Sequence, residues 1–193
     1  DKVCDQISDG VLDANDACLE EAGSAEARGC PVRDGDGDQV SDHLDNCPAE
    51  AGPAANHGCP ERQKQLVVAT RQKLLILEKV QFETAKAKVL KKSYRLLEQI
   101  ASVIKSHPTL GVVSIEGHTD SRGNAQFNFR LSEQRARAVL EYLVKRGGVD
   151  LARLTSQGFG AANPADTNET AQGREKNRRV EFRILQAEPV APA

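Results

Sequence analysis

Apolar residues in the later part of the chain recur with the spacings of strands and helices. Residues 74–82 (LLILEKVQF) are apolar and rich in branched side chains, which predicts a strand. Between Val89 and Ile104 the apolar side chains recur at helical spacing, and Pro108 ends that helix. Residues 112–118 (VVSIEGH) predict a second strand bounded by glycines.

The pattern continues to the end of the chain. We expect a long helix at 124–146, a turn at 150–153, strands at 154–158 and 179–185, and a loop at 159–172. The resulting order βαβαββ predicts an α/β (α+β) two-layer sandwich with parallel strand pairs joined by right-handed crossovers. Residues 187–193 are expected to form a disordered tail.

Charge divides the chain into two parts of opposite sign. The first 62 residues hold 15 acidic and 4 basic side chains, whereas residues 63–193 hold 13 acidic and 22 basic ones. All five cysteines fall in the acidic part. We therefore expect a small acidic domain at 1–62 and the α/β domain at 63–186. Cysteines in a region with little apolar material indicate disulfides, and hence an oxidising compartment.

The acidic part contains an internal repeat with a period of 29 residues. Its conserved spacing includes the aspartates and cysteines, because Asp9, Asp13, Asp16 and Cys18 recur as Asp38, Asp42, Asp45 and Cys47. Each repeat has two cysteines 12 positions apart, which favours the pairs Cys18–Cys30 and Cys47–Cys59. Other pairings remain open, because spacing does not fix connectivity. Cys4 has no counterpart, and we expect its partner in an upstream repeat.

The second repeat has the ligand spacing of a calcium-binding loop. Numbered from its first aspartate, carboxylates stand at positions 1, 3, 5, 9 and 12, and position 7 would offer a backbone carbonyl, as in an EF-hand. The predicted ligands are Asp34, Asp36, Asp38, Val40, Asp42 and Asp45. A cation would relieve the repulsion among five nearby carboxylates. A solvated, disordered acidic linker is the alternative interpretation.

The first repeat offers fewer ligands. Its matching residues are Asp5, Asp9, Asp13 and Asp16. Because Ile7 stands at position 3, we expect weaker calcium binding there. Residues 5–60 resemble thrombospondin type 3 repeats, apart from Ile7 and from Gln39, which stands at a turn position where glycine is expected. The resemblance implies Ca²⁺ as cofactor and disulfide-tied loops that form a stiff stalk.

The most informative segment of the basic part is 116–123 (EGHTDSRG). It leaves the carboxyl end of a predicted strand and enters a helix, where open α/β sheets commonly bind ligands. Further along, Asn128, Leu131 and Arg135 share one face of that helix, since they stand at i, i+3 and i+7. If this face turns toward the loop, Asp120 and Arg135 flank one crevice.

Motifs in this part resemble the OmpA-like C-terminal domain, a module that peptidoglycan-associated lipoprotein and flagellar stator B-subunits also carry. They are Gly117-His-Thr-Asp120, Asn128-x-x-Leu131-Ser132-x-x-Arg135-Ala136, Gly158-Phe-Gly160 and Gly173-Arg174-x-x-Asn177-Arg178-Arg179-Val180-Glu181-Phe182. The resemblance covers about residues 66–186. It implies non-covalent binding of peptidoglycan through the diaminopimelate of the stem peptide.

The resemblance also implies which residues contact the ligand. The family's aspartate and arginine fall on Asp120 and Arg135, with lesser contacts at Thr119, Asn128, Leu131 and Arg178. The family's early motif, an apolar residue followed by Asp-x-Asn, is here FETA at 82–85, so Glu83 replaces the aspartate. These residue types suit diaminopimelate, whose free end carries one ammonium and one carboxylate on the same carbon. A carboxylate accepts from the ammonium, while arginine grips the carboxylate with two parallel hydrogen bonds.

Other interpretations of these residues predict different functions. Asp120 and Arg135 are also compatible with an internal salt bridge or a helix cap. The basic cluster at 174–179 lacks an aromatic ladder, which argues against nucleic acid as a partner. His118 and Asp120 alternate on an extended segment, yet the other histidines show no matching zinc pattern. Without a nucleophile elbow, phosphate loop or cofactor fingerprint, we expect a binding protein and not an enzyme.

These patterns together predict an anchor protein in the periplasm of a diderm bacterium, associated with the outer membrane and cell wall. A calcium-stiffened spacer would precede the peptidoglycan-binding domain. Because the chain starts at Asp1 and has no methionine, we expect an upstream outer-membrane element as the second anchor. The alternative is a calcium-dependent adhesive or structural envelope protein, in which the repeats bind a protein partner.

Overall fold

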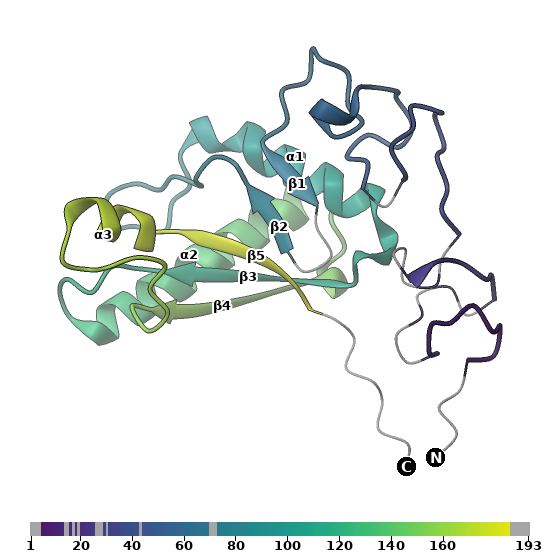
Figure 1. Ribbon diagram of the computed structural model, residues 1–193. Helices are drawn as coiled ribbons and strands as arrows, with labels where there is room; N and C mark the ends of the chain where they lie inside the picture. The colour runs from purple at the N-terminus through teal and green to yellow at the C-terminus, as the bar shows by residue number, and fades with distance from the viewer. Residues whose placement is uncertain are drawn as a thin grey trace. The chain divides into compact units, whose positions relative to one another are not determined.

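The computed structural model describes residues 5–13, 16, 18, 20–25, 29, 31–42, 44–69 and 73–185 (Figure 1). The chain divides into two compact units. One contains the described residues up to Lys64 together with Ser106–Thr109, and the other contains Gln65–Lys105 and Leu110–Leu185. The predicted tail at 187–193 lies outside the described residues. Among those that are described, no helix combines the length and apolar character needed to cross a membrane.

The second unit is built on one five-stranded sheet with the strand order β1-β2-β5-β3-β4. Its strands are β1 (Val67–Ala69), β2 (Lys73–Ile76), β3 (Val112–His118), β4 (Leu154–Gly160) and β5 (Val180–Leu185). The β3–β4 pair is parallel, whereas β1–β2, β2–β5 and β3–β5 are antiparallel. The sheet is therefore mixed, with β5 inserted between β2 and β3.

The helices of this unit are α1 (Tyr94–Ser106, without its last residue), α2 (Ala125–Lys145) and α3 (Ala171–Asn177), with 3-10 turns η3 (Lys91–Ser93) and η5 (Leu151–Arg153). A further 3-10 turn, η4 (Pro108–Leu110), falls mostly in the segment that groups with the first unit. Apolar residues of α1 and α2 join alternate residues of β3 and β5 in one buried core. Val113 and Ile115 of β3 and Phe182 of β5 belong to this core. Because side chains alternate across a strand, the intervening residues of β3 and β5 form a polar face on the other side of the sheet.

Helix α2 begins and ends close to the residues that its capping asparagine and terminal glycines predict. The Asn124 side chain caps the helix by accepting from the Phe127 N–H at 2.9 Å. After the last turn, Gly148 adopts φ +67°, and the Val149 N–H donates to the Leu143 carbonyl at 3.1 Å. Six residues of α2 are buried, namely Asn128, Leu131, Ser132, Ala136, Val139 and Leu143.

Two glycines let α2 pack directly on the sheet. A Cβ atom at Gly117 would approach the Ser132 carbonyl oxygen to 2.2 Å, and one at Gly158 would approach the Glu133 nitrogen to 2.4 Å. The Ser132 hydroxyl in turn accepts from the Gly160 N–H at 2.9 Å. This close approach places the first turns of α2 against the ends of β3 and β4, where the candidate site lies.

The observed topology differs from the predicted βαβαββ sandwich in four respects. Strand β1 and helix α3 were not expected, and the strand predicted at 74–82 ends at Ile76, followed by an isolated bridge between Phe82 and Val89. Only one strand pair among the described residues is parallel, because β5 separates β2 from β3. The part of the predicted fold class that is confirmed is a mixed α/β sheet with helices.

The first unit consists mainly of turns and bends, with a 3-10 helix η2 (Ala54–Asn56). Its 29-residue sequence repeat is also a repeat in hydrogen bonding. Asp9 Oδ2 accepts from the Gly23 N–H at 2.9 Å, and Asp38 Oδ2 accepts from the Gly52 N–H at 3.0 Å. Corresponding aspartates in the two repeats therefore fold their loops in the same way.

Disulfides close the loops of this unit. Cys47 and Cys59 are bonded, as predicted, and enclose a segment of 12 positions. Cys18 is also disulfide-bonded, whereas Cys30, its predicted partner, and Cys4 lie outside the described residues. A cross-link of this loop length limits the unfolded chain and stabilises the fold by about 3 kcal/mol.

Candidate functional site

Asp120 lies two residues after the end of β3 and is almost fully buried. Its Oδ2 atom accepts a hydrogen bond from Arg178 Nη1 at 2.6 Å, and its Oδ1 atom accepts from the Arg122 N–H at 3.0 Å. Burial acts to raise the pKa of Asp120, but the hydrogen bonds from Arg178 and Arg122 outweigh it and hold the pKa below its usual value. Asp120 is therefore a carboxylate at neutral pH.

Arg135, on α2, is placed against the segment after β2 and not against a carboxylate. Its Nε atom donates to the Lys86 carbonyl at 3.1 Å, and its guanidinium lies 5.0 Å from the centre of the Phe82 ring. Burial and the positive charge of Arg178 both lower the pKa of Arg135. Among the described residues, no acidic side chain forms an ion pair with Arg135.

Arg178 connects these two predicted residues. It hydrogen-bonds Asp120, and its charge acts on Arg135, so all three side chains belong to one electrostatic cluster. Arg178 also pairs with Glu175 of α3, and about a third of its side chain is exposed. The structure thus brings Asp120 close to Arg178 and not into a direct pair with Arg135.

Asn128 and Thr119 support the same loop in different ways. The Asn128 amide donates to the carbonyls of Asp120 and Arg122 at 3.2 and 2.9 Å, which holds the loop over the first turn of α2. The Thr119 N–H donates to the Gly160 carbonyl at 2.8 Å. Its Oγ1 atom is buried with no hydrogen-bond partner in the described part of the chain. Leu131 is buried on the same helix.

Glu83 is held by two lysines of its own segment. It forms ion pairs with Lys88 at 2.6 Å and Lys86 at 2.9 Å. The hydrogen bonds from Lys88 and Lys86 lower the pKa of Glu83 to about 2. A ligand cation would have to compete with these two ammonium groups.

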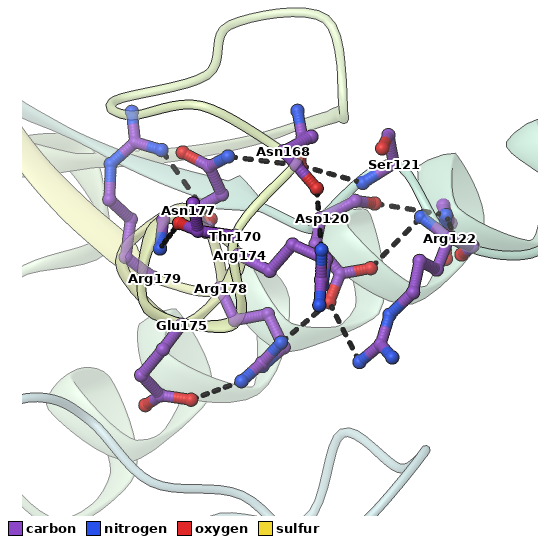
Figure 2. A network of polar contacts seen from close by, with 12 residues as sticks. Asp120, Ser121, Arg122, Asn168, Thr170, Arg174, Glu175, Asn177, Arg178 and Arg179 are labelled. Atoms are coloured by element: carbon purple, nitrogen blue, oxygen red, sulfur yellow. Dashed lines mark hydrogen bonds and ion pairs between the residues drawn. The ribbon is translucent and has the colours of Figure 1, made fainter.

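A network behind Asp120 was missed by reading the sequence (Figure 2). The fully buried Asn177 accepts from the N–H groups of Ala165 and Asp166 at 2.8 and 2.9 Å and donates to Asn168 Oδ1 at 3.0 Å. Asn168 Oδ1 also accepts from the Ser121 N–H at 3.0 Å. The loop before α3 is thereby fastened to the residue that follows Asp120. The one feature of the sequence that could have indicated this network is the position of Asn177 within one of the family motifs.

The predicted calcium ligands of the second repeat lie close together. One carboxylate oxygen from each of Asp34, Asp36 and Asp38 falls within 4.8 Å of the others. Asp45 is fully buried, and its Oδ2 atom has no hydrogen-bond partner in the described part of the chain, as is also true of Asp36 Oδ2. Burial raises the pKa of Asp45 to about 6, and the charges of Asp38 and Asp36 add to the rise. Mutually repelling carboxylates, two of which have a buried oxygen without a partner in the described part of the chain, fit a hard cation.

The other predicted ligands have backbone partners. Asp42 accepts from the Gly35 N–H at 2.8 Å, and the Val40 N–H donates to Asp38 at 2.7 Å. In the first repeat, Asp13 accepts from the Gln6 N–H at 2.9 Å and Asp5 from the Gly10 N–H at 3.0 Å. Asp16 Oδ2 is buried without a partner in the described part of the chain, as Asp45 Oδ2 is.

The second unit is thus a small domain with helices packed on a mixed α/β sheet and a buried aspartate just after an interior strand, β3. A family model described as the OmpA family matches residues 81–178, which is about half of the chain. The chain belongs to the OmpA family. This match covers neither of the acidic repeats.

Several named proteins are similar to part of the chain over about 100 residues. Outer membrane porin F of Pseudomonas aeruginosa is 41% identical over 105 residues, covering 54% of this chain and 30% of the porin. Probable lipoprotein YiaD of Escherichia coli is 40% identical over 105 residues, or 54% and 47% of the two chains. Peptidoglycan-binding protein ArfA of Mycobacterium tuberculosis is 41% identical over 96 residues, or 50% and 29%. The chain spans less than half the length of each of these relatives.

Solved structures show the same fold. The peptidoglycan-associated lipoprotein from Burkholderia pseudomallei has a TM-score of 0.50 and 30% identity, covering 55% of this chain and 89% of that chain. The cell wall anchor of the T6SS from Pseudomonas aeruginosa has a TM-score of 0.53 and 30% identity, covering 63% and 87%. None of these five proteins is named for an enzymatic activity.

Proposed function

We propose that the second unit binds peptidoglycan non-covalently and anchors its protein to the cell wall without catalysing a reaction. Relatives named as a peptidoglycan-binding protein, a peptidoglycan-associated lipoprotein and a cell wall anchor support this proposal. The observation that carries it is the buried carboxylate of Asp120 beside the cationic side chain of Arg178, whose charge in turn acts on Arg135. Opposite charges held in place at the end of a strand suit a zwitterionic ligand.

The ligand group we propose is the free amino-acid end of diaminopimelate in the stem peptide. Its ammonium would donate to Asp120, and its carboxylate would accept from Arg135, whose desolvated guanidinium contacts a backbone carbonyl and a ring. Arg178 would then share Asp120 with the ligand, since its partly exposed side chain also has Glu175 as a partner. Thr119 Oγ1, buried without a partner in the described part of the chain, is available to the ligand carboxylate.

The other residues predicted to contact the ligand have lesser roles in this proposal. Asn128 would position the Asp120 loop, and Leu131 would pack beneath the ligand. Glu83 would attract a ligand cation only after losing part of its contact with Lys86 and Lys88.

Titration of a diaminopimelate-containing stem peptide into the full chain tests the proposal. Asp120→Asn keeps the size of the side chain and should weaken binding by roughly tenfold or more, since a charged hydrogen bond contributes about 1.5–3 kcal/mol. The lysine-containing stem peptide lacks the second carboxylate and should bind weakly to the parent protein. Arg137→Lys, on the exposed surface of α2, is the matched control and should bind as the parent does. Equal affinity of Asp120→Asn and parent would reject this site.

For the acidic repeats we propose calcium binding, with Asp34, Asp36, Asp38, Asp42, Asp45 and the Val40 carbonyl as ligands in the second repeat. The shared hydrogen bonds of the two repeats and the buried, unpartnered oxygens of Asp36 and Asp45 support this. A weaker site would use the corresponding aspartates of the first repeat, Asp5, Asp9, Asp13 and Asp16. Filled loops closed by disulfides would make a stiff spacer, as in thrombospondin type 3 repeats.

In this proposal the chain works in the periplasm, between the outer membrane and the cell wall. Relatives named as outer membrane proteins support the location. Pull-down on purified sacculi with and without EGTA separates the roles of the two units. Binding that persists in EGTA and is lost in Asp120→Asn is expected. Binding that requires calcium and is unaffected by Asp120→Asn would instead favour adhesive repeats.

A further inference from the structure

The polar face of the sheet holds a cluster that the peptidoglycan site does not use. Glu116 of β3 lies directly opposite Glu181 of β5 in the antiparallel register, and His118 follows two positions later on the same face. One oxygen of each carboxylate and one ring nitrogen of His118 lie within 4.8 Å of one another. Like charges directly opposite each other on neighbouring strands destabilise a sheet, so this cluster requires positive charge.

His118 has a ring whose polar atoms are unsatisfied. The residue is 2% exposed, and neither Nδ1 nor Nε2 has a hydrogen-bond partner in the described part of the chain. Its ring stacks on Phe159 with centroids 5.3 Å apart, which fixes the plane of the imidazole. A buried polar group without a partner destabilises the fold, and a ligand atom at the ring nitrogen would remove that cost.

The donor set matches a transition metal better than calcium. Calcium takes oxygen ligands only, whereas an imidazole nitrogen with carboxylate oxygens suits Zn²⁺ and its neighbours. Burial, with help from the charge of Arg179, lowers the pKa of His118 to about 4, so the ring is neutral at pH 7. Ligand atoms at bond lengths of about 2.0–2.2 Å around a tetrahedral ion lie about 3.4 Å apart, which requires only a small closure of this cluster.

Two arginines now neutralise the carboxylates. Arg179 Nε contacts Glu181 at 2.5 Å, and its side chain is mostly buried. Arg183 Nε lies 3.9 Å from Glu116, too far for a hydrogen bond, and its side chain is 64% exposed. Arg183 is therefore the cation that a metal ion would displace, because it can move into solvent at little cost.

Solvent reaches the cluster at Glu181, whose side chain is 44% exposed and faces a pocket of about 380 Å³ beside β5. Glu181, Arg179 and Arg183 line it, together with residues of β2 and α3. A hydrated ion would therefore meet the cluster first at the carboxylate of Glu181.

We propose that Glu116, His118 and Glu181 form a binding site for a divalent transition metal of the Zn²⁺ type, with water completing the coordination. The site is separate from the calcium ligands of the first unit and from the Asp120 cluster. It does not depend on peptidoglycan binding.

The test is a titration of Co²⁺ and Zn²⁺ into the full chain with Ca²⁺ in excess, so that the acidic repeats are saturated. Co²⁺ is followed by its visible absorption and Zn²⁺ by calorimetry, with an amide NMR spectrum of each variant to show that it is folded. We expect saturable binding in the parent, at least tenfold weaker binding in His118→Gln and Glu181→Gln, and unchanged binding in the control Glu141→Gln.

Arg183→Gln tests the site in the opposite direction, because a merely structural disturbance would not tighten metal binding. Removing the competing guanidinium should tighten Co²⁺ binding severalfold. The proposal is overturned if the parent shows no saturable binding, or if folded Glu181→Gln binds as the parent does. Weaker or unchanged metal binding by a folded Arg183→Gln would equally reject it.

Discussion

Arg178 Nη1 lies 2.6 Å from Asp120 Oδ2, although 58 residues separate the two in the chain. The pair joins the loop after β3 to the first of the two residues between α3 and β5. Asp120 is buried and carries its negative charge because Arg178 and the Arg122 N–H compensate the loss of water. This arrangement keeps a buried carboxylate charged and in a fixed position.

Replacing Arg178 should change the titration of Asp120. Burial raises the pKa of Asp120, and the hydrogen bond from Arg178 opposes that rise. In Arg178→Gln the charged donor is gone, so the pKa of Asp120, measured by carboxyl-carbon NMR, should rise. Because the pKa of Asp120 is lowered in the parent, the Asp120–Arg178 pair stabilises the fold at any pH above the ordinary pKa of aspartate. This stabilisation is lost as the pH falls through the pKa of Asp120 in the folded protein. The variant should therefore lose about 1–2 kcal/mol at pH 7 and less at pH 3. The same loss at both pH values would contradict this.

Arg135→Lys tests the geometry of the cationic side. Lysine keeps the charge but lacks the planar fork that binds a carboxylate with two parallel hydrogen bonds. Affinity for the diaminopimelate-containing peptide should fall by roughly tenfold, with little change in melting temperature. Arg130→Lys, at an exposed position of the same helix, is the matched control. Full affinity in Arg135→Lys would show that only net charge matters.

Asn177→Ala should loosen the loop before α3. The substitution removes the acceptor for the Ala165 and Asp166 N–H groups and leaves them unpaired, at a cost of about 2–4 kcal/mol. Through Asn168, amide hydrogen exchange at Ser121 should also accelerate. Asn163→Ala, at an exposed position in the same loop, should leave both quantities unchanged. Unaltered exchange at Ser121 would mean that the network does not support the Asp120 loop.

Calcium affinity should depend on pH through Asp45. Without metal its pKa is about 6, above the unfolded value, so the negative charge destabilises the repeat above pH 6 and the destabilisation disappears as pH falls toward 4. Calorimetry should show weaker Ca²⁺ binding at pH 5.5 than at pH 7.5, because a proton competes with the ion. Asp45→Asn should stabilise the metal-free repeat at pH 7.5 by about 1–3 kcal/mol while weakening Ca²⁺ binding. A calcium affinity that is equal at both pH values would contradict the role of Asp45.

Local elements were predictable from the sequence because they depend on near neighbours. The strand predicted at 112–118 is β3, and the helix predicted at 124–146 is α2, whose cap at Asn124 and terminal glycines act within one turn. The short helix α3 was missed, since its seven residues lie in a segment rich in loop-forming residues. The position of β5 between β2 and β3 was also missed, because sheet order depends on contacts that no local pattern contains.

The sequence by itself determined the family motifs, the repeat of 29 residues and the location of Asp120 at the end of a strand. It favoured the Cys47–Cys59 bond but left other pairings open, and the structure contains that bond. Only the tertiary structure decided which cation neutralises Asp120 and which residues surround His118. Both answers depend on where β5 enters the sheet, since Arg178 precedes that strand and Glu181 lies within it. Periodicity reports contacts a few residues apart, whereas these pairs are set by the packing of distant segments into one core.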